Sequence, residues 1–178
     1  INAAAARVLD RIGISLVTAP RAGCCGAVDF HLNYQDDGRQ AMRRNVEAWL
    51  PLLDGGAEVI AITASGCGTT VKEYGHYLAQ YAAYAKRAAR VSAATKDLSE
   101  LLGAESERLV PLLEAASKNK PRRKIAFHSP CSLQHAQQIR GLAEELLTAA
   151  GFDLTFVPDA HLCCGSAGTY SLLQPELS

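Results

Sequence analysis

The sequence contains no long apolar run, no secretion signal and no excess of charge of either sign. It has no stretch of eighteen consecutive apolar residues that could cross a membrane. Its first thirty residues lack the basic and apolar segments of a signal peptide. Lys and Arg number 18 and Asp and Glu also number 18, so the charge balance favours neither nucleic acid nor a strongly charged substrate. We therefore expect a cytoplasmic protein that does not bind nucleic acid.

The composition is that of a globular protein, with 48% hydrophobic and 20% charged residues among 178. A chain of this kind can bury a core. It opens on Ile1 inside a helical pattern and stops at Ser178 just after another helix is predicted to begin. We therefore expect it to be a fragment of a longer protein.

Six cysteines are the most informative feature, and they are Cys24, Cys25, Cys67, Cys131, Cys163 and Cys164. Four of them form two vicinal pairs. Adjacent cysteines can form a disulfide with each other only through a strained ring, and the chain has no secretion signal, so a disulfide framework is disfavoured. In a cytoplasmic chain, clustered thiols indicate metal binding or catalysis.

The hydrophobic periodicity predicts helices that alternate with strands. Apolar residues spaced three and four apart predict amphipathic helices at Ile1–Ile12, Met42–Leu53 and about Ala136–Ala150. Short apolar runs predict strands at Ile14–Ala19, Glu58–Thr63, Lys124–His128 and Phe152–Val157. Two or three further helices are expected between Thr69 and Ser117, and another begins after Gly165. This alternation is typical of parallel α/β units.

The two ends of the chain repeat one order of elements. Ile139 and Ile1 open matching apolar stripes 138 positions apart, and one inserted residue later Cys163-Cys164-Gly165 lies on Cys24-Cys25-Gly26. We expect an α/β fold of two pseudo-repeated small lobes with parallel sheets and with cysteines on their βα loops. We predict a first repeat, truncated at its N-terminus, at residues 1–75. A helical connector with a basic linker is predicted at residues 76–123, and a second repeat, truncated at its C-terminus, at residues 124–178.

Every cysteine comes shortly after a predicted strand. Ligands gather at the carboxyl ends of parallel strands, so cysteines that are distant in the sequence are expected to converge on one edge of a sheet. Flanking glycines would let the backbone approach a compact ligand and donate amide hydrogen bonds to it, although each one alone is equally typical of an ordinary turn. These glycines are Gly23, Gly26, Gly66, Gly68, Gly165 and Gly168.

Soft thiolate ligands select iron–sulfur clusters, zinc or copper(I), and a cluster needs about four of them. Each repeat supplies three, namely Cys24, Cys25 and Cys67 in the first and Cys131, Cys163 and Cys164 in the second. By the repeat offset, the counterpart of Cys131 falls before Ile1 and that of Cys67 falls beyond Ser178. We therefore expect four cysteines in each complete copy of the parent protein.

A cysteine followed by thirty-one residues and then Cys-Cys-Gly, as in Cys131 to Gly165, resembles the cysteine-rich CCG domain that heterodisulfide reductase also contains. The strings FHSPCSLQHAQ, HLCCGSAGTYSLLQPE and ASGCGTTVKEYG are most similar to the iron–sulfur subunits of glycolate oxidase, or glycolate dehydrogenase. The resemblance covers essentially the whole chain. It implies that all six cysteines are ligands of 4Fe-4S clusters, one for each complete repeat.

The resemblance also implies an electron-transfer subunit, incomplete as a catalyst alone, that accepts electrons from FAD-containing subunits oxidising glycolate to glyoxylate. FAD would be bound only by those partner subunits. A ferredoxin-like domain is expected to precede this segment in the parent chain. The implied location is the cytoplasm. Whether the complex also associates peripherally with the inner face of the cytoplasmic membrane stays open. Similar subunits serve lactate or glycerol 3-phosphate oxidation, so the substrate also stays open.

Three alternatives compete with this interpretation. In heterodisulfide reductase the motif ends Cys-x-x-Cys, whereas here Thr70 stands three residues after Cys67, which puts a thiol/disulfide redox enzyme in doubt. A structural zinc site would also use four cysteines, but the usual short cysteine knuckles are missing. A cysteine-nucleophile enzyme would use Cys67 on its strand-to-helix turn, with a histidine base such as His31, His76 or His128.

Overall fold

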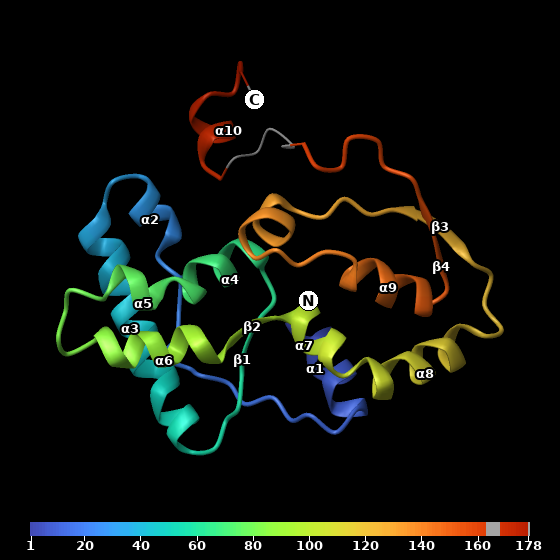
Figure 1. Ribbon diagram of the computed structural model, residues 1–178, viewed down its shortest axis with the longest axis horizontal. Coiled ribbons are helices and arrows are strands. Elements are labelled where there is room, and N and C mark those ends of the chain that lie inside the picture. Colours follow the sequence, from blue (N-terminus) through green and yellow to red (C-terminus); the bar gives the residue numbers. More distant parts are fainter. Residues whose placement is uncertain (163–167, 178) are drawn as a thin grey trace. The chain divides into compact units, whose positions relative to one another are not determined.

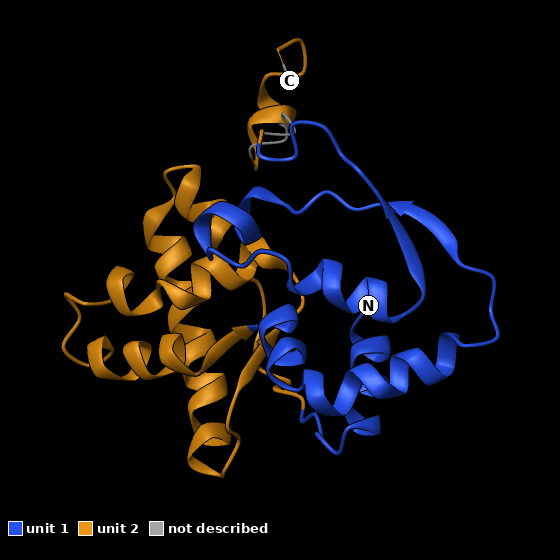
Figure 2. Ribbon diagram, turned by 45° about the vertical axis from the view of Figure 1, so that its right-hand side comes forward, with its two compact units in different colours: residues 1–17, 97–161 blue, residues 18–96, 162–178 orange. Residues whose placement is uncertain are grey.

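The computed structural model describes residues 1–162 and 168–177. These residues form two compact units (Figure 2). Unit 1 consists of residues 1–17 and 97–161, and unit 2 consists of residues 18–96 and 162–178. Each unit is therefore assembled from two separate stretches of the chain.

Unit 2 is mainly helical. Its helices are α2 (Ala27–His31), α3 (Gln35–Asp54), α4 (Ser65–Lys72), α5 (Tyr74–Tyr77), α6 (Ala85–Ala94) and α10 (Tyr170–Leu173). One short sheet pairs β1 (Ile60–Ile62) with β2 (Thr95–Asp97). The blue-to-green helices of Figure 1, from α2 to α6, surround the same core.

The core of unit 2 forms on one face of α3. Met42, Val46 and Leu50 follow one another at four-residue spacing, and all three are buried. They pack in one cluster with Val71 of α4 and Val91 of α6. The helix predicted over Met42–Leu53 is therefore confirmed, and the observed helix begins earlier, at Gln35.

Unit 1 holds a second, smaller core. Its elements are α1 (Asn2–Arg11), α7 (Leu98–Ala104), α8 (Ser106–Ser117), β3 (Arg123–Ala126), the π-helical turn η1 (Ser132–Ala136), α9 (Leu142–Ala149) and β4 (Phe152–Thr155). Leu9, Ile12 and Leu109 are buried together at its centre. The helix predicted over Ile1–Ile12 is confirmed as α1, whose apolar stripe faces this core.

β3 and β4 form the parallel pair that the sequence predicts. Arg123 lies opposite Phe152 and Ala126 lies opposite Thr155, and the two strands run side by side in Figure 1. α9 lies between them in the sequence and contacts β4, which makes a strand–helix–strand unit. The α/β fold class is therefore confirmed: helices combine with short parallel strands in two small sheets.

Three sequence-based predictions of local structure were wrong. Residues 14–19 form no strand, and within the described part of the chain no other strand pairs with them, so Leu16 and Val17 are 46% and 66% exposed. The helix predicted from about residue 136 begins only at Leu142, because Gln138 and Gly141 adopt positive φ angles that an α-helix cannot contain.

The third error concerns the segment from Thr69 to Ser117, where two or three helices were predicted. Four helices, α5 to α8, lie wholly within it together with the unpredicted strand β2. Local caps divide the segment: the Asp97 side chain accepts a hydrogen bond from the Ser99 amide, and the Glu100 side chain accepts one from the Asp97 amide. The uniform Ala- and Leu-rich composition of the segment did not indicate the helix boundary at Asp97.

Gly26 fixes the Cys-Cys-Gly loop against α3. Its φ angle is +84°, and a Cβ atom at this position would lie 2.5 Å from the Gly38 carbonyl oxygen. Gly56 also has a positive φ angle, +102°, but a Cβ atom there would meet nothing within 4 Å. Close backbone approach therefore requires glycine at position 26, in addition to the backbone conformation.

We expect Gly26→Ala to lower the free energy of unfolding by about 3 kcal/mol, because a methyl group adds a backbone clash to the cost of a positive φ angle. Gly56→Ala is the matched control and should cost about 1 kcal/mol, since only the φ angle is unfavourable there. Urea denaturation of the two variants measures both values. Equal losses would contradict the close packing of Gly26 on Gly38.

Candidate metal centre

Cys24 and Cys25 lie in the loop that leads into α2. Gly26 is the residue before the first residue of that helix, and its left-handed conformation turns the chain there. The two cysteines differ in environment, since Cys24 is exposed and Cys25 is 7% exposed and belongs to the core of unit 2. One thiol of the pair therefore faces solvent while the other is enclosed.

Cys67 enters the same place from a different part of the chain. It lies in the first turn of α4, just after β1 and the connecting residues, and it packs against the core of unit 2. The Sγ atoms of Cys25 and Cys67 are 3.4 Å apart although the residues are separated by 42 positions. All four described cysteines are free thiols, so this contact is not a disulfide.

The distance between the two sulfur atoms suits a shared metal ion. Tetrahedral ligands with metal–sulfur bonds of about 2.3 Å place neighbouring sulfur atoms roughly 3.8 Å apart. The contact of 3.4 Å between Cys25 and Cys67 needs only a small adjustment to reach that value. Two soft thiolates at this spacing fit one zinc ion, and they fit a 4Fe-4S cluster, which binds each thiolate at a different iron, once the sulfur atoms move farther apart.

Two residues outside the predicted site support the cysteine loop. Asn45 of α3 and Tyr74 of α5 are both fully buried, and both form hydrogen bonds with the loop backbone. Neither is among the site residues that the sequence predicts. A signal was present, because Asn45 is a polar residue on the apolar stripe of α3, and a buried carboxamide requires hydrogen-bond partners.

Burial dominates the electrostatics of the site. It raises the pKa of the Cys25 thiol from the ordinary value of 9.0 to about 12, assisted by the neighbouring thiols Cys67 and Cys24 and opposed by the backbone amide of Ala27. Burial also raises the pKa of Tyr74. In the absence of a bound cation, Cys25 is therefore a protonated thiol at neutral pH. A metal ion that binds there must displace this proton.

The second group of cysteines belongs to a different part of the structure. Cys131 is half-buried and immediately precedes η1 in unit 1. Cys163 and Cys164 lie outside the described residues, so their assignment as ligands stays a prediction. Gly165 lies outside them too.

Side chains around Cys131 bind the segment that leads toward Cys163. The Gln134 side-chain amide donates to the Ser129 and Ala160 carbonyl oxygens, at 2.8 Å each. Nε2 of His128 lies 3.0 Å from the Ala160 carbonyl oxygen, and Nε2 of His135 lies 3.0 Å from the His161 carbonyl oxygen. A carbonyl can only accept, so both ring nitrogens carry a proton. These contacts bring residues 160 and 161 to the loop that holds Cys131.

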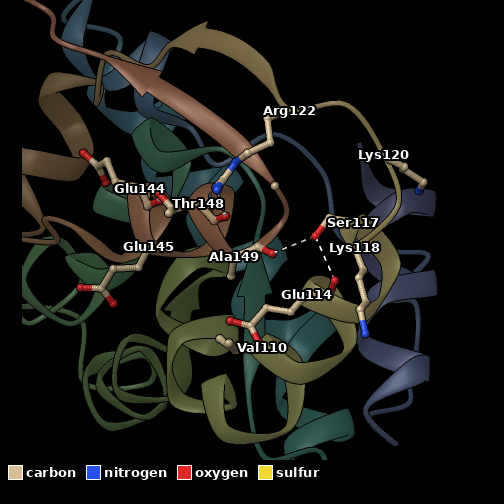
Figure 3. A pocket seen from close by; sticks show the side chains of 11 residues that line it. Val110, Glu114, Ser117, Lys118, Lys120, Arg122, Glu144, Glu145, Thr148 and Ala149 are labelled. Carbon is tan, nitrogen blue, oxygen red and sulfur yellow. Dashed lines mark hydrogen bonds between the residues drawn. The ribbon is translucent and has the colours of Figure 1, made fainter.

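Residues 1–162 and 168–177 contain no gathered set of three or more metal-binding side chains. None of their helices is both long and apolar enough to span a membrane. A hollow of about 760 Å³ in unit 1 is lined by residues of α8, α9 and the segments that follow them, and no cysteine lines it (Figure 3). Its three basic residues are matched in number by three acidic ones, namely Lys118, Lys120 and Arg122 against Glu114, Glu144 and Glu145. The cysteine loops are therefore the candidate site.

We expect iodoacetamide to alkylate Cys25 at least about tenfold more slowly than exposed Cys24 at pH 8 in the iron-free protein, because the buried thiol is protonated and only thiolate is the nucleophile. The rate at Cys25 should keep rising as the pH passes 9.0, since its pKa in the folded chain lies higher. Peptide mass spectrometry resolves the two sites. In urea the two rates should become equal, and equal rates in the folded protein would contradict the buried thiol.

Comparison with known proteins identifies a family and several named relatives. The sequence model of the CCG family, described as a cysteine-rich domain, matches residues 1–72 and 125–178. The glycolate oxidase iron-sulfur subunit of Escherichia coli is 54% identical over 99% of this chain and 42% of its own length. The probable glycolate oxidase iron-sulfur subunit of Bacillus subtilis is 27% identical over 99% of this chain and 38% of its own length.

A further relative carries a different name. Lactate utilization protein A of Bacillus velezensis is 26% identical over the whole chain and 71% of its own length. The chain spans about two fifths of the length of the two glycolate oxidase subunits. The family match extends over both cysteine groups and most of the chain. The chain therefore belongs to the CCG cysteine-rich domain family.

Proposed function

We propose that this chain is the cluster-binding part of an iron–sulfur subunit that carries electrons for a flavin-linked 2-hydroxy acid dehydrogenase of the glycolate type. One structural observation carries the proposal: Cys25 and Cys67, from separate turns of the chain, bring their sulfur atoms to 3.4 Å in a chain of the CCG family. The name of the Escherichia coli relative supports it. The subunit relays electrons and is not a complete catalyst alone.

Each copy of the repeat supplies ligands to one cluster. Cys24, Cys25 and Cys67 serve the first copy, and Cys131, Cys163 and Cys164 serve the second, with a fourth cysteine completing each in the parent chain. Four thiolates can hold a 4Fe-4S cluster, and this is the cluster type that the resemblance to the CCG family implies. A bound cluster supplies one-electron redox chemistry. The chain's own residues provide the thiolates, exclude water around Cys25 and point the Ala27 amide at its sulfur.

The electron donors in this proposal are partner subunits that bind FAD. A ferredoxin-like domain precedes this segment in the parent chain and passes electrons on. The complex works in the cytoplasm, and peripheral contact with the inner face of the cytoplasmic membrane would place it near an electron acceptor. Glycolate is the proposed substrate because two of the relatives are named for glycolate oxidase, while the lactate utilization relatives make lactate the competing one.

Structural zinc is the second candidate, because the 3.4 Å contact between sulfur atoms suits two thiolates on one zinc ion, whereas a 4Fe-4S cluster binds each thiolate at a different iron and needs the sulfur atoms farther apart. Disulfide cleavage of the heterodisulfide reductase kind receives less support. Thr70 stands where that motif has its last cysteine, and its hydroxyl is buried and donates to the Gly66 carbonyl oxygen. No thiol is available at that position for a fifth ligand.

Metal analysis of the full-length parent protein, purified without oxygen, tests the proposal. We expect iron and acid-labile sulfide in near-equal amounts, with broad visible absorbance that bleaches when glycolate is added together with the flavin subunits. Omission of the flavin subunits is the control, and it should prevent bleaching. Zinc without iron would overturn the proposal in favour of a structural site. Bleaching by lactate alone would reassign the substrate.

A further inference from the structure

A pair of fully buried polar side chains, Asn45 and Tyr74, forms hydrogen bonds with the backbone of the cysteine loop. Asn45 accepts a hydrogen bond at Oδ1 from the Gly23 amide, at 2.8 Å. This contact fixes the orientation of the Asn45 carboxamide, because the backbone N–H of Gly23 can only donate a hydrogen bond. Nδ2 of Asn45 then faces the Cys24 carbonyl oxygen at 2.9 Å and the Gly23 carbonyl oxygen at 3.4 Å.

Tyr74 extends this network to the next residue of the loop. Nδ2 of Asn45 donates to the Tyr74 hydroxyl oxygen at 3.1 Å, and that hydroxyl donates to the Cys25 carbonyl oxygen at 2.8 Å. The carbonyl groups of three successive residues, Gly23, Cys24 and Cys25, therefore accept hydrogen bonds from the buried Asn45 and Tyr74 side chains, and the Cys24 carbonyl oxygen also accepts one from the Arg44 guanidinium at 3.0 Å. Asn45 and Tyr74 come from α3 and α5, which are held together by the core of unit 2.

The network disfavours other positions of the cysteine loop, because its polar side chains are costly to bury without hydrogen-bond partners. A carboxamide and a hydroxyl removed from water lose free energy unless they are hydrogen-bonded, and here both are 0% exposed. Displacement of the loop would leave Asn45 and Tyr74 without partners inside the core. The network also directs the carbonyl oxygens of residues 23, 24 and 25 toward Asn45 and Tyr74. The negative ends of these three carbonyl dipoles are therefore already hydrogen-bonded when the thiols become negatively charged thiolates.

We propose that Asn45 and Tyr74 are positioning residues that hold Cys25 opposite Cys67 and so preorganise the metal-binding thiols. The inference rests on the proposed function, in which the thiols bind a metal centre. The hydrogen bonds and distances that support it are those of the iron-free chain. Neither residue contacts the metal. Both act through the backbone of the Cys24-Cys25 loop, and their loss should alter the spacing of the thiols before it unfolds the protein.

The variants are chosen to separate positioning from stability. Tyr74→Phe removes one hydroxyl and keeps the ring in the core, and Asn45→Asp keeps the acceptor for Gly23 while removing both donors. Tyr77→Phe is the matched control, because its hydroxyl lies on the same helix and bonds the exposed Glu73 carboxylate instead of the loop. Val91→Ala is a core control that destabilises unit 2 without removing a hydrogen bond of the loop network.

The first measurement is the rate at which a Cys25–Cys67 disulfide forms in the iron-free full-length protein under limiting diamide, which takes up the two electrons and two protons. Peptide mass spectrometry identifies the bond. We expect Tyr74→Phe to slow its formation about fivefold, the ratio that corresponds to loss of one hydrogen bond of about 1 kcal/mol. Tyr77→Phe and Val91→Ala should stay within about twofold of the wild type. An unchanged rate in Tyr74→Phe, or equal slowing in Val91→Ala, would overturn the inference.

The second measurement uses the iron-loaded full-length protein. Tyr74→Phe should shift the midpoint potential and the electron paramagnetic resonance spectrum of one cluster, whereas Val91→Ala should leave both as in the wild type. A potential unchanged in both Tyr74→Phe and Asn45→Asp would count against positioning. Failure of the wild-type protein to bind iron would refute the proposed function alone, because the diamide result does not depend on iron.

Discussion

The approach of Cys25 to Cys67 is the constraint on which the candidate site depends, and the two thiols do not sustain it themselves. A thiol is a weak hydrogen-bond partner, and burial makes Cys25 harder to ionise. The free energy that holds them together comes from the apolar face of α3 packed against α4, α5 and α6. Gly26 then lets the loop backbone reach Gly38 on the same helix. The core of unit 2 thus acts as the scaffold that presents two sulfur atoms at metal-binding distance.

Both units anchor their cysteine-bearing segments through backbone carbonyls, with different side chains. In unit 2 the carbonyls of residues 23, 24 and 25 accept hydrogen bonds from Asn45 and Tyr74. In unit 1 the carbonyls of residues 160 and 161 face His128, Gln134 and His135. These donors are directed at backbone carbonyl oxygens and not at thiol sulfur atoms. A preorganised ligand set requires less rearrangement when a metal centre is inserted, which favours binding and a fixed redox potential.

Local patterns predicted much of this structure, and tertiary contacts account for what they missed. The stripes of α1 and α3 and the pair β3–β4 follow from apolar spacing, because each is a property of neighbouring residues. Residues 14–19 have the composition of a strand, yet a strand also needs a partner, which composition cannot supply. The Cys-Cys-Gly motif predicted which thiols bind the cluster, and that assignment stays a prediction. The motif did not indicate that Cys25 would be buried, or that Asn45 and Tyr74, 22 and 49 positions from their loop partners, would support it.

The central claim is that Cys25 and Cys67 serve one and the same centre, and iron content per chain in alanine variants of the full-length protein tests it most directly. If both thiols hold one cluster, Cys25→Ala, Cys67→Ala and the double variant should all lose the same amount of iron, because the second substitution has nothing further to remove. Cys131→Ala, in the other copy, should lose a separate and additive amount. Additive losses for Cys25→Ala and Cys67→Ala, or full iron content in the double variant, would contradict the account.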